Sequence, residues 1–551
     1  MLNALTRAHQ IEHMSKTEYD LLIIGGGITG AGIALDATMR GLKVALVEMQ
    51  DFSEGTSSRS TKLIHGGLRY LKQLQIGVVK ETGRERAIVY ENGPHVTTPE
   101  WMLLPFRKGG TFGEFTTNIG LKVYDSLAKV EKNERRHMLS KKEVLERVPN
   151  INKKALQGGG YYVEYKTDDS RLTIEVMKKA AQYGADLVNY LKADGFIYEK
   201  ETIKGLKTTD QLSGITHNIL AKAVVNAAGP WVDEVRAYDK DEPVSKKHLV
   251  HTKGVHLVFK QEDFPLTQAV YFDTESDGRM IFAIPRSGKT YVGTTDTFYT
   301  DDKKNPVADA KDKAYLIEAI NFMFPSLNLT HDHIESSWAG IRPLIQSSSS
   351  KNASDISRKD EIWHNNSGLI TIAGGKLTGY RHMAEEIVDE VSLYLKKNYK
   401  MHIAKVSTKN EPISGGDVGG SIGYHNFADN ISRKAQSYGL TLEEGHMLAL
   451  KYGSNAETVY QYAGITNDSE EKYGLPKALY AEVIYSILHE MVVKPTDFLI
   501  RRSGKLYFAI EEVMQYRQGI EKLLSDTFSW TDSQYEQYVS ELDRAIADTK
   551  H

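Results

Sequence analysis

Three glycines near the N-terminus have the spacing of a turn that binds a pyrophosphate. Gly25, Gly27 and Gly30 form the pattern G-x-G-x-x-G. The first glycine permits a tight turn, the second lets backbone approach the anion, and the third lets a helix pack closely on a strand. Glu48 follows eighteen residues after Gly30, where a carboxylate can accept hydrogen bonds from the hydroxyls of an adenosine ribose. This combination predicts that the chain binds a dinucleotide.

The residues around this pattern have the periodicity of the elements that must position it. YDLLIIGGG (19–27) predicts a buried strand, ITGAGIALDATMRG (28–41) predicts a helix, and LKVALVEM (42–49) predicts a second buried strand. Together they form a βαβ unit, with the pyrophosphate expected at the N-terminus of the helix. Two further apolar strands that end in glycine are expected within 221–231 and 368–381.

The segment after Glu48 favours FAD over NAD as the dinucleotide. Residues 54–70 (EGTSSRSTKLIHGGLRY) are dense in hydroxyl and basic groups. Ser57, Ser58 and Lys62 could hold the second half of an extended FAD, although an ordinary polar helix start would have the same composition. The chain has no cysteine, so redox chemistry must come from a bound cofactor. For the same reason, the cofactor cannot be attached through a cysteine thioether.

Composition limits the other classes of function. A length of 551 residues predicts two or three domains, and 40% apolar with 26% charged residues is ordinary for a globular protein. The net charge of −3 argues against nucleic-acid binding. The first twenty residues do not read as a signal peptide, and no run approaches the roughly 18 to 20 apolar residues that span a bilayer. We expect a cytoplasmic protein, or one on the inner membrane face without crossing it.

Several segments together resemble the FAD-dependent glycerol-3-phosphate dehydrogenases of the aerobic, respiratory type and their oxidase relatives. The matching segments occur in the expected order within residues 18–395: DLLIIGGGITGAGIALDATMRG, GTSSRSTKLIHGGLRYL, VVNAAGPWVD, YVGTTDT, WAGIRPL and IAGGKLTGYRHMAEE. KPTDFLIRRSGKLYF (494–508) resembles part of the helical domain that this family carries at its C-terminus. The resemblance implies oxidation of sn-glycerol 3-phosphate to dihydroxyacetone phosphate, with electrons passed through FAD to a quinone or to oxygen.

The expected fold class is α/β, with a Rossmann-type FAD-binding domain, an inserted α+β substrate domain built on an antiparallel sheet, and a C-terminal helical domain. The oxidoreductase core is expected at 18–395, a linker at 396–420 and the helical domain at 421–551. Within the core, the expected segments are about 18–90, 166–245 and 340–395 for FAD binding, and about 91–165 and 246–339 for the substrate domain.

Oxidation of a secondary alcohol needs a base for the hydroxyl proton. His65 in KLIHGGLRY is the candidate, because imidazole titrates near neutral pH and the family motif implies a place near the flavin. The alternatives are that His65 only packs against the cofactor, or that water or another group takes the proton.

The doubly charged phosphate of the substrate needs cations, and the planar fork of arginine can bind it bidentately. The residues that match the family motifs are Arg69, Arg342, Arg358 and Lys376, with hydroxyl groups from Tyr70 and Thr378. We expect Arg69, Arg342 and Lys376 to serve catalysis as well, whereas the SRKD match of Arg358 is short. A solvated surface charge is the alternative for each cation.

Small residues at two later strand ends are expected to let backbone pass close to the cofactor. Gly374 and Gly375 precede a helix expected to begin near Leu377, whose N-terminus would stabilise negative charge on the reduced flavin. Ala228 and Gly229, after Ala227, are interpreted in the same way, although close strand packing would also explain the alanines.

The active-site residues do not choose between quinone and oxygen as the acceptor. The resemblance implies an additional insertion in the oxidase branch, and this chain passes from YVGTTDT to WAGIRPL in about 40 residues. We therefore favour a dehydrogenase that reduces quinone at a membrane surface; a homodimer is a further candidate assembly. The alternatives are a peroxide-forming glycerophosphate oxidase, an amine or amino-acid oxidase, and a flavin-bearing scaffold or RNA-modification partner.

Overall fold

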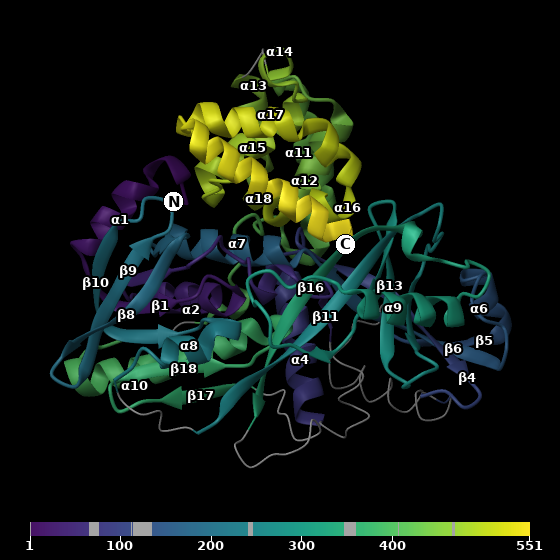
Figure 1. Ribbon diagram of the computed structural model, residues 1–551, viewed down its shortest axis with the longest axis horizontal. Coiled ribbons are helices and arrows are strands. Elements are labelled where there is room, and N and C mark those ends of the chain that lie inside the picture. Colours follow the sequence, from purple (N-terminus) through teal and green to yellow (C-terminus); the bar gives the residue numbers. More distant parts are fainter. Residues whose placement is uncertain are drawn as a thin grey trace.

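The computed structural model describes residues 2–65, 76–111, 113, 135–240, 246–346, 360–405, 407–465 and 469–550. Two sheets with their helices lie side by side, and a layer of C-terminal helices covers one side of both (Figure 1). This arrangement confirms the predicted fold class of an α/β core followed by a helical domain.

The first sheet has a parallel centre of Rossmann type. β1 pairs in parallel with both β2 and β10, so that Leu22 lies between Ala45 and Val224, and β10 continues the parallel pairing to β18. The order along the sheet is β17 (Glu361–His364), β18 (Leu369–Ala373), β10 (Thr216–Asn226), β1 (Glu18–Ile24), β2 (Val44–Val47) and β7 (Asp186–Val188), with β9 (Thr202–Asp210) and β8 (Leu191–Glu199) following antiparallel from β10.

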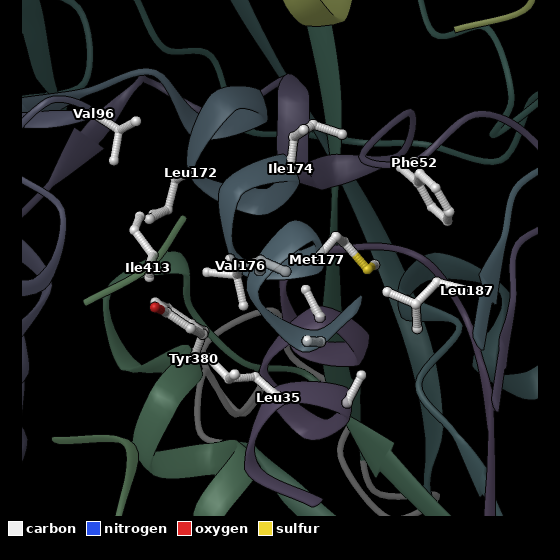
Figure 2. Packing of buried hydrophobic residues seen from close by; sticks show 14 of the residues in the cluster. Leu35, Phe52, Val96, Leu172, Ile174, Val176, Met177, Leu187, Tyr380 and Ile413 are labelled. Carbon is white, nitrogen blue, oxygen red and sulfur yellow. The ribbon is translucent and has the colours of Figure 1, made fainter. Parts of the chain in front are cut away.

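Alternate residues of β1 enter different cores, as the two-residue period of a strand requires. Leu21 and Ile23 belong to the cluster formed with α2 (Ile28–Met39), α7 (Asp169–Gln182) and α10 (Tyr380–Tyr399). Figure 2 shows part of this cluster, with Leu35 of α2, Met177 of α7 and Tyr380 of α10 among the labelled side chains. Leu22 and Ile24 belong instead to the cluster that contains residues of α1 (Arg7–Ser15), β8 and β9.

The second sheet is antiparallel except for β12 and β4, which pair in parallel over two residues. β4 and β6 run together from the Thr97–Thr167 pair to Arg107–Leu156, and β11 pairs with β16 along almost its whole length. The order is β15 (Thr297–Phe298), β11 (His248–Lys260), β14 (Lys289–Gly293), β13 (Met280–Arg286), β12 (Ala269–Asp273), β4 (Thr97–Arg107), β6 (Leu156–Thr167) and β3 (Leu63–Ile64), with β16 (Ile334–Gln346) on β11 and β5 (His137–Ser140) on β6.

Further helices connect the strands of the core: α4 (Ile76–Asn92), α6 (Lys141–Arg147), α8 (Val232–Arg236) and α9 (Ala310–Met323). The C-terminal domain consists of α11 (Gly420–Ser432), α12 (Leu442–Tyr452), α13 (Ala456–Ile465), α14 (Ser469–Tyr473), α15 (Lys477–Glu490), α16 (Lys505–Phe508), α17 (Ile510–Phe528) and α18 (Asp532–Lys550). Thr441 and Glu444 form a capping box at the start of α12. None of the helices described has the length and apolarity to cross a bilayer.

Replacing Gly30 by alanine is expected to destabilise the first sheet, because the added Cβ would lie 1.9 Å from the carbonyl oxygen of Gly25. Overpacking of this kind lowers the free energy of unfolding by about 1–3 kcal/mol. Thermal unfolding followed by circular dichroism measures the effect. Gly195→Ala in β8 is the control, because its Cβ would meet no heavy atom within 4 Å. Equal melting temperatures for the two variants would contradict this account of the packing of α2.

Candidate active site

Two cavities adjoin each other where the first and second sheets meet. Cavity A has a volume of about 350 Å³ and lies between the β1–α2 turn, the end of β2 and the segments 227–231 and 374–377. Cavity B has a volume of about 300 Å³ and is lined by residues of β3, β6, β11, β13 and β16. Their common wall consists of Thr56, Ser60, Pro343, Gly375, Lys376 and Leu377.

The glycine turn forms one wall of cavity A. Gly25 and Gly27 line the cavity, and Gly25 has a φ of +115°, a conformation that side chains rarely adopt. The N–H group of Ile28, at the first position of α2, donates to Ser57 Oγ at 2.9 Å. Gly30 does not line the cavity and lies where α2 crosses the turn. Gly25 and Gly27 thus lie at the turn and the cavity wall, and Gly30 lies at the contact between helix and turn, as the pattern G-x-G-x-x-G predicts.

Glu48 brings a carboxylate to the wall of cavity A at the end of β2. Its Oε2 accepts from the N–H of Gly26 at 2.6 Å, and its Oε1 accepts from the N–H of Gln50 at 2.8 Å. Burial raises the pKa of Glu48 to about 7, and the nearby charges of Glu54 and Asp51 act in the same direction, against the effect of the two N–H groups. A partner that donates hydrogen bonds, such as a ribose hydroxyl, would stabilise the ionised form.

The three polar residues expected to hold the cofactor after Glu48 do not share one position. Ser57 lines cavity A, whereas Ser58 and Lys62 line neither cavity. The buried ammonium of Lys62 binds Asp169 Oδ1 at 2.6 Å and the carbonyl of Ser58 at 3.0 Å. A buried cation needs a carboxylate partner, and Asp169 provides it from the start of α7. Contact of Ser58 and Lys62 with the cofactor stays a prediction.

The small residues of the two later segments lie where the sequence places them. Ala227, Ala228 and Gly229 line cavity A after β10, and Gly374 and Gly375 line it after the neighbouring strand β18. A 3-10 turn begins at Leu377 and leads into α10 at Tyr380, so the helix expected near Leu377 begins three residues later.

His65 follows β3 and lines cavity B. Burial lowers its pKa below the ordinary value of 6.5, and the charges of Lys376 and Arg86 add to this effect, whereas Glu164 opposes it. Its carbonyl accepts from Thr378 Oγ1 at 3.4 Å, and Thr378 also lines the cavity. The imidazole is therefore neutral near pH 7, the form in which it can accept a proton.

Cationic side chains also line cavity B. Arg342 of β16 donates to Asp296 Oδ1 at 3.2 Å and to Thr294 Oγ1 at 3.1 Å. Arg279 approaches the other oxygen of Asp296 at 3.3 Å, so one carboxylate aligns two guanidinium groups. Lys376 reaches the same cavity from the common wall. The arrangement can bind a multiply charged anion beside the imidazole of His65.

Two neighbours of this site were missed in the sequence. Arg279 and His256 line cavity B, although no motif contains them. His256 is almost fully buried, lies 2.9 Å from Thr61 Oγ1 through Nε2, and has a pKa well below 6.5 because of that burial. For His256, the only available signal was the two-residue period of β11, which places Gly254 and His256 on the same face. Arg69, Tyr70 and Arg358 lie outside the described residues, and their roles stay predictions.

Comparison with known proteins agrees with this geometry. The family model of FAD-dependent oxidoreductases matches residues 20–381, and that of the C-terminal domain of alpha-glycerophosphate oxidase matches residues 406–535. An aerobic glycerol-3-phosphate dehydrogenase of Staphylococcus haemolyticus (strain JCSC1435) is 59% identical over 99% of this chain and 97% of its own. One of Staphylococcus aureus (strain USA300) is 58% identical over 100% of this chain and 98% of its own.

Solved structures show the same relationship. The glycerol-3-phosphate dehydrogenase of Bacillus halodurans complexed with FAD superposes with a TM-score of 0.87 at 46% identity, over 100% of this chain and 99% of the other. The L-alpha-glycerophosphate oxidase of Mycoplasma pneumoniae has a TM-score of 0.55 at 18% identity, over 72% of this chain and 98% of the other, a likeness of fold alone. The chain belongs to the FAD-dependent oxidoreductases and, within them, to the family of the aerobic glycerol-3-phosphate dehydrogenases.

Proposed function

We propose that this protein oxidises sn-glycerol 3-phosphate to dihydroxyacetone phosphate with FAD as its cofactor and a quinone as the electron acceptor. The observation that carries the proposal is the pairing of a dinucleotide cavity with a second cavity that joins a neutral imidazole to Arg342, Arg279 and Lys376. The full-length similarity to aerobic glycerol-3-phosphate dehydrogenases supports the same substrate.

The residues of cavity A fit FAD. The N-terminus of α2 at the glycine turn suits a pyrophosphate, and the carboxylate of Glu48 suits the ribose hydroxyls. Ser57, Ala228 and Gly229 complete this part of the wall, and the common wall around Gly375 leads from cavity A into cavity B. When bound, FAD supplies the acceptor for the hydride that leaves the substrate carbon.

The cations of cavity B would hold the phosphate group of the substrate. Arg342 and Arg279 share Asp296, which keeps both guanidinium groups on the cavity wall. Lys376 adds a positive charge from the side of cavity A, and Thr378 adds a hydroxyl group. A phosphate bound in this way leaves the carbinol carbon near His65, whose neutral imidazole takes the hydroxyl proton.

The quinone acceptor is supported by the compactness of the segment that precedes WAGIRPL. Between β15 and β16 the chain forms only α9, a 3-10 turn and short connections. A quinone dissolves in the bilayer, so its use favours a protein that sits peripherally on the cytoplasmic face of the membrane. Both this location and a homodimer stay proposals.

Anaerobic reduction by the substrate tests the proposed activity. Mixing the yellow holoenzyme with glycerol 3-phosphate is expected to bleach the flavin absorbance, whereas glycine and D-amino acids leave it unchanged. A second mixing step with a soluble quinone should restore the absorbance faster than oxygen does. Bleaching by an amino acid alone would assign the protein to the amino-acid oxidases, and rapid stoichiometric peroxide without a quinone response would replace the acceptor by oxygen.

Arg342→Ala is expected to lower kcat/KM for glycerol 3-phosphate on the order of 10²-fold or more, because the phosphate loses a charge-assisted partner. Gly254→Ala should act in the same direction, since its Cβ would lie 2.4 Å from Arg342 Nη2 and displace that side chain. Steady-state kinetics with an artificial dye measures both variants. Arg433→Ala, on the exposed surface of the C-terminal domain, is the control. Wild-type activity on glycerol equal to that on its phosphate would remove the role of these cations.

The pH dependence of the reaction tests His65. The base acts in its neutral form and burial lowers its pKa, so kcat/KM should rise through an apparent pKa below 6.5 and then level off. His65→Ala should still bind the substrate but bleach the flavin much more slowly, whereas the exposed control His9→Ala should not change the rate. A normal reduction rate in His65→Ala would assign the proton to another acceptor.

A further inference from the structure

One loop of cavity A is held from outside the core. Residues 48–57 follow β2, and Glu48, Met49, Glu54 and Gly55 within them line the cavity. Asp51, in the same loop, is completely buried and does not line the cavity. Its carboxylate contacts residues that are about 450 positions later in the sequence.

Arg501 and Arg502 of the C-terminal domain both bind this one carboxylate. Arg501 Nε donates to Asp51 Oδ2 at 2.6 Å, and Arg502 donates to Oδ2 at 2.7 Å and to Oδ1 at 2.9 Å. Arg501 also lies 3.5 Å from Glu54, whose side chain borders cavity A. The C-terminal domain therefore contacts the cofactor loop through two buried guanidinium groups.

The local backbone explains how consecutive arginines reach the same group. Residues Asp497–Arg502 form a π-helical turn, a rare element that often occurs at functional positions. Asp497 accepts from Arg501 at 2.8 Å, and the carbonyl of Glu490 accepts from Arg502 at 2.7 Å. Each arginine thus has partners on its own domain and on the cofactor loop.

The contact continues as a buried network along α7, which lies beneath the C-terminal helices (Figure 1). Glu490 accepts from Arg171 Nη1 at 3.0 Å and pairs with Lys178 at 3.3 Å. Removing one member of such a network leaves its partner charged and buried, which is strongly destabilising. Breaking any one contact of this network between the domain and the core therefore costs free energy, because it leaves a charge buried without its partner.

We infer that Arg501 and Arg502 are positioning residues for FAD, and that through Asp51 the C-terminal helical domain keeps the loop 48–57 in the shape that binds the cofactor. The inference rests on the FAD site proposed above. Cofactor binding and docking of the helical domain then stabilise each other, because a coupling between two sites is reciprocal. A loop that keeps this shape only about one tenth of the time would bind FAD about tenfold more weakly.

Release of FAD from the diluted holoenzyme, followed by flavin fluorescence, tests the inference. Asp51→Asn and Arg502→Gln are expected to raise the Kd for FAD about tenfold or more. Excess FAD should restore kcat, with little change in KM for glycerol 3-phosphate, and Arg502→Lys should recover part of the affinity. A merely structural role would lower the melting temperature without this pattern of rescue.

Arg517→Gln is the matched control, because Arg517 pairs with the buried Glu521 in the same domain, outside cavities A and B. A Kd shift in the Asp51 and Arg502 variants no larger than in this control would overturn the inference. Hydrogen exchange of the wild-type protein gives a decision even if the variants do not fold: FAD should slow exchange at residues 497–508 but not in α13, and no slowing there would also overturn it. Failure of glycerol 3-phosphate to reduce the flavin would refute the proposed substrate and leave these FAD measurements valid.

Discussion

The close contact between the glycine turn and the start of α2 is the constraint on which the cofactor site depends. The turn ends β1, its backbone opens the N-terminus of α2 toward cavity A, and the absence of a side chain at Gly30 lets the helix cross it. The same helix packs on α7 and α10 through the main apolar cluster. Since α10 begins just after the common wall of the two cavities, the packing of α2 also influences where cofactor and substrate sites meet.

The proposed substrate site is assembled by both sheets rather than by either one. Lys376 comes from the connection between β18 and α10, whereas Arg342 comes from β16 of the second sheet. Asp296 fixes the second-sheet cations relative to each other, because a single carboxylate accepts from two guanidinium groups. Relative movement of the sheets would therefore change the spacing between the cations and the cofactor wall without altering either half.

The sequence predicted those parts of the site whose reasons are local. The glycine spacing, Glu48 at the end of β2 and the small residues after β10 and β18 all follow from neighbours along the chain, and they line cavity A apart from Gly30. The ion pair of Lys62 with Asp169 was not predicted, because Asp169 is more than a hundred residues away and only the tertiary fold brings it close. Arg279 and His256 were missed because their position depends on the register of β11, β13 and β14, which a single sequence does not reveal.

The buried charges on α7 have a consequence for the chain while it is being synthesised. Arg171, Glu175 and Lys178 occupy a surface of the core that the C-terminal domain covers, and Glu490 is synthesised some three hundred residues later. Domains generally fold from the N-terminus as the chain emerges. Until the C-terminal domain is made, Arg171, Glu175 and Lys178 on this face are hydrated and pair with one another along the helix. This charged face of α7 is therefore compatible with water in the growing chain, and it is dehydrated only when the helical domain is complete.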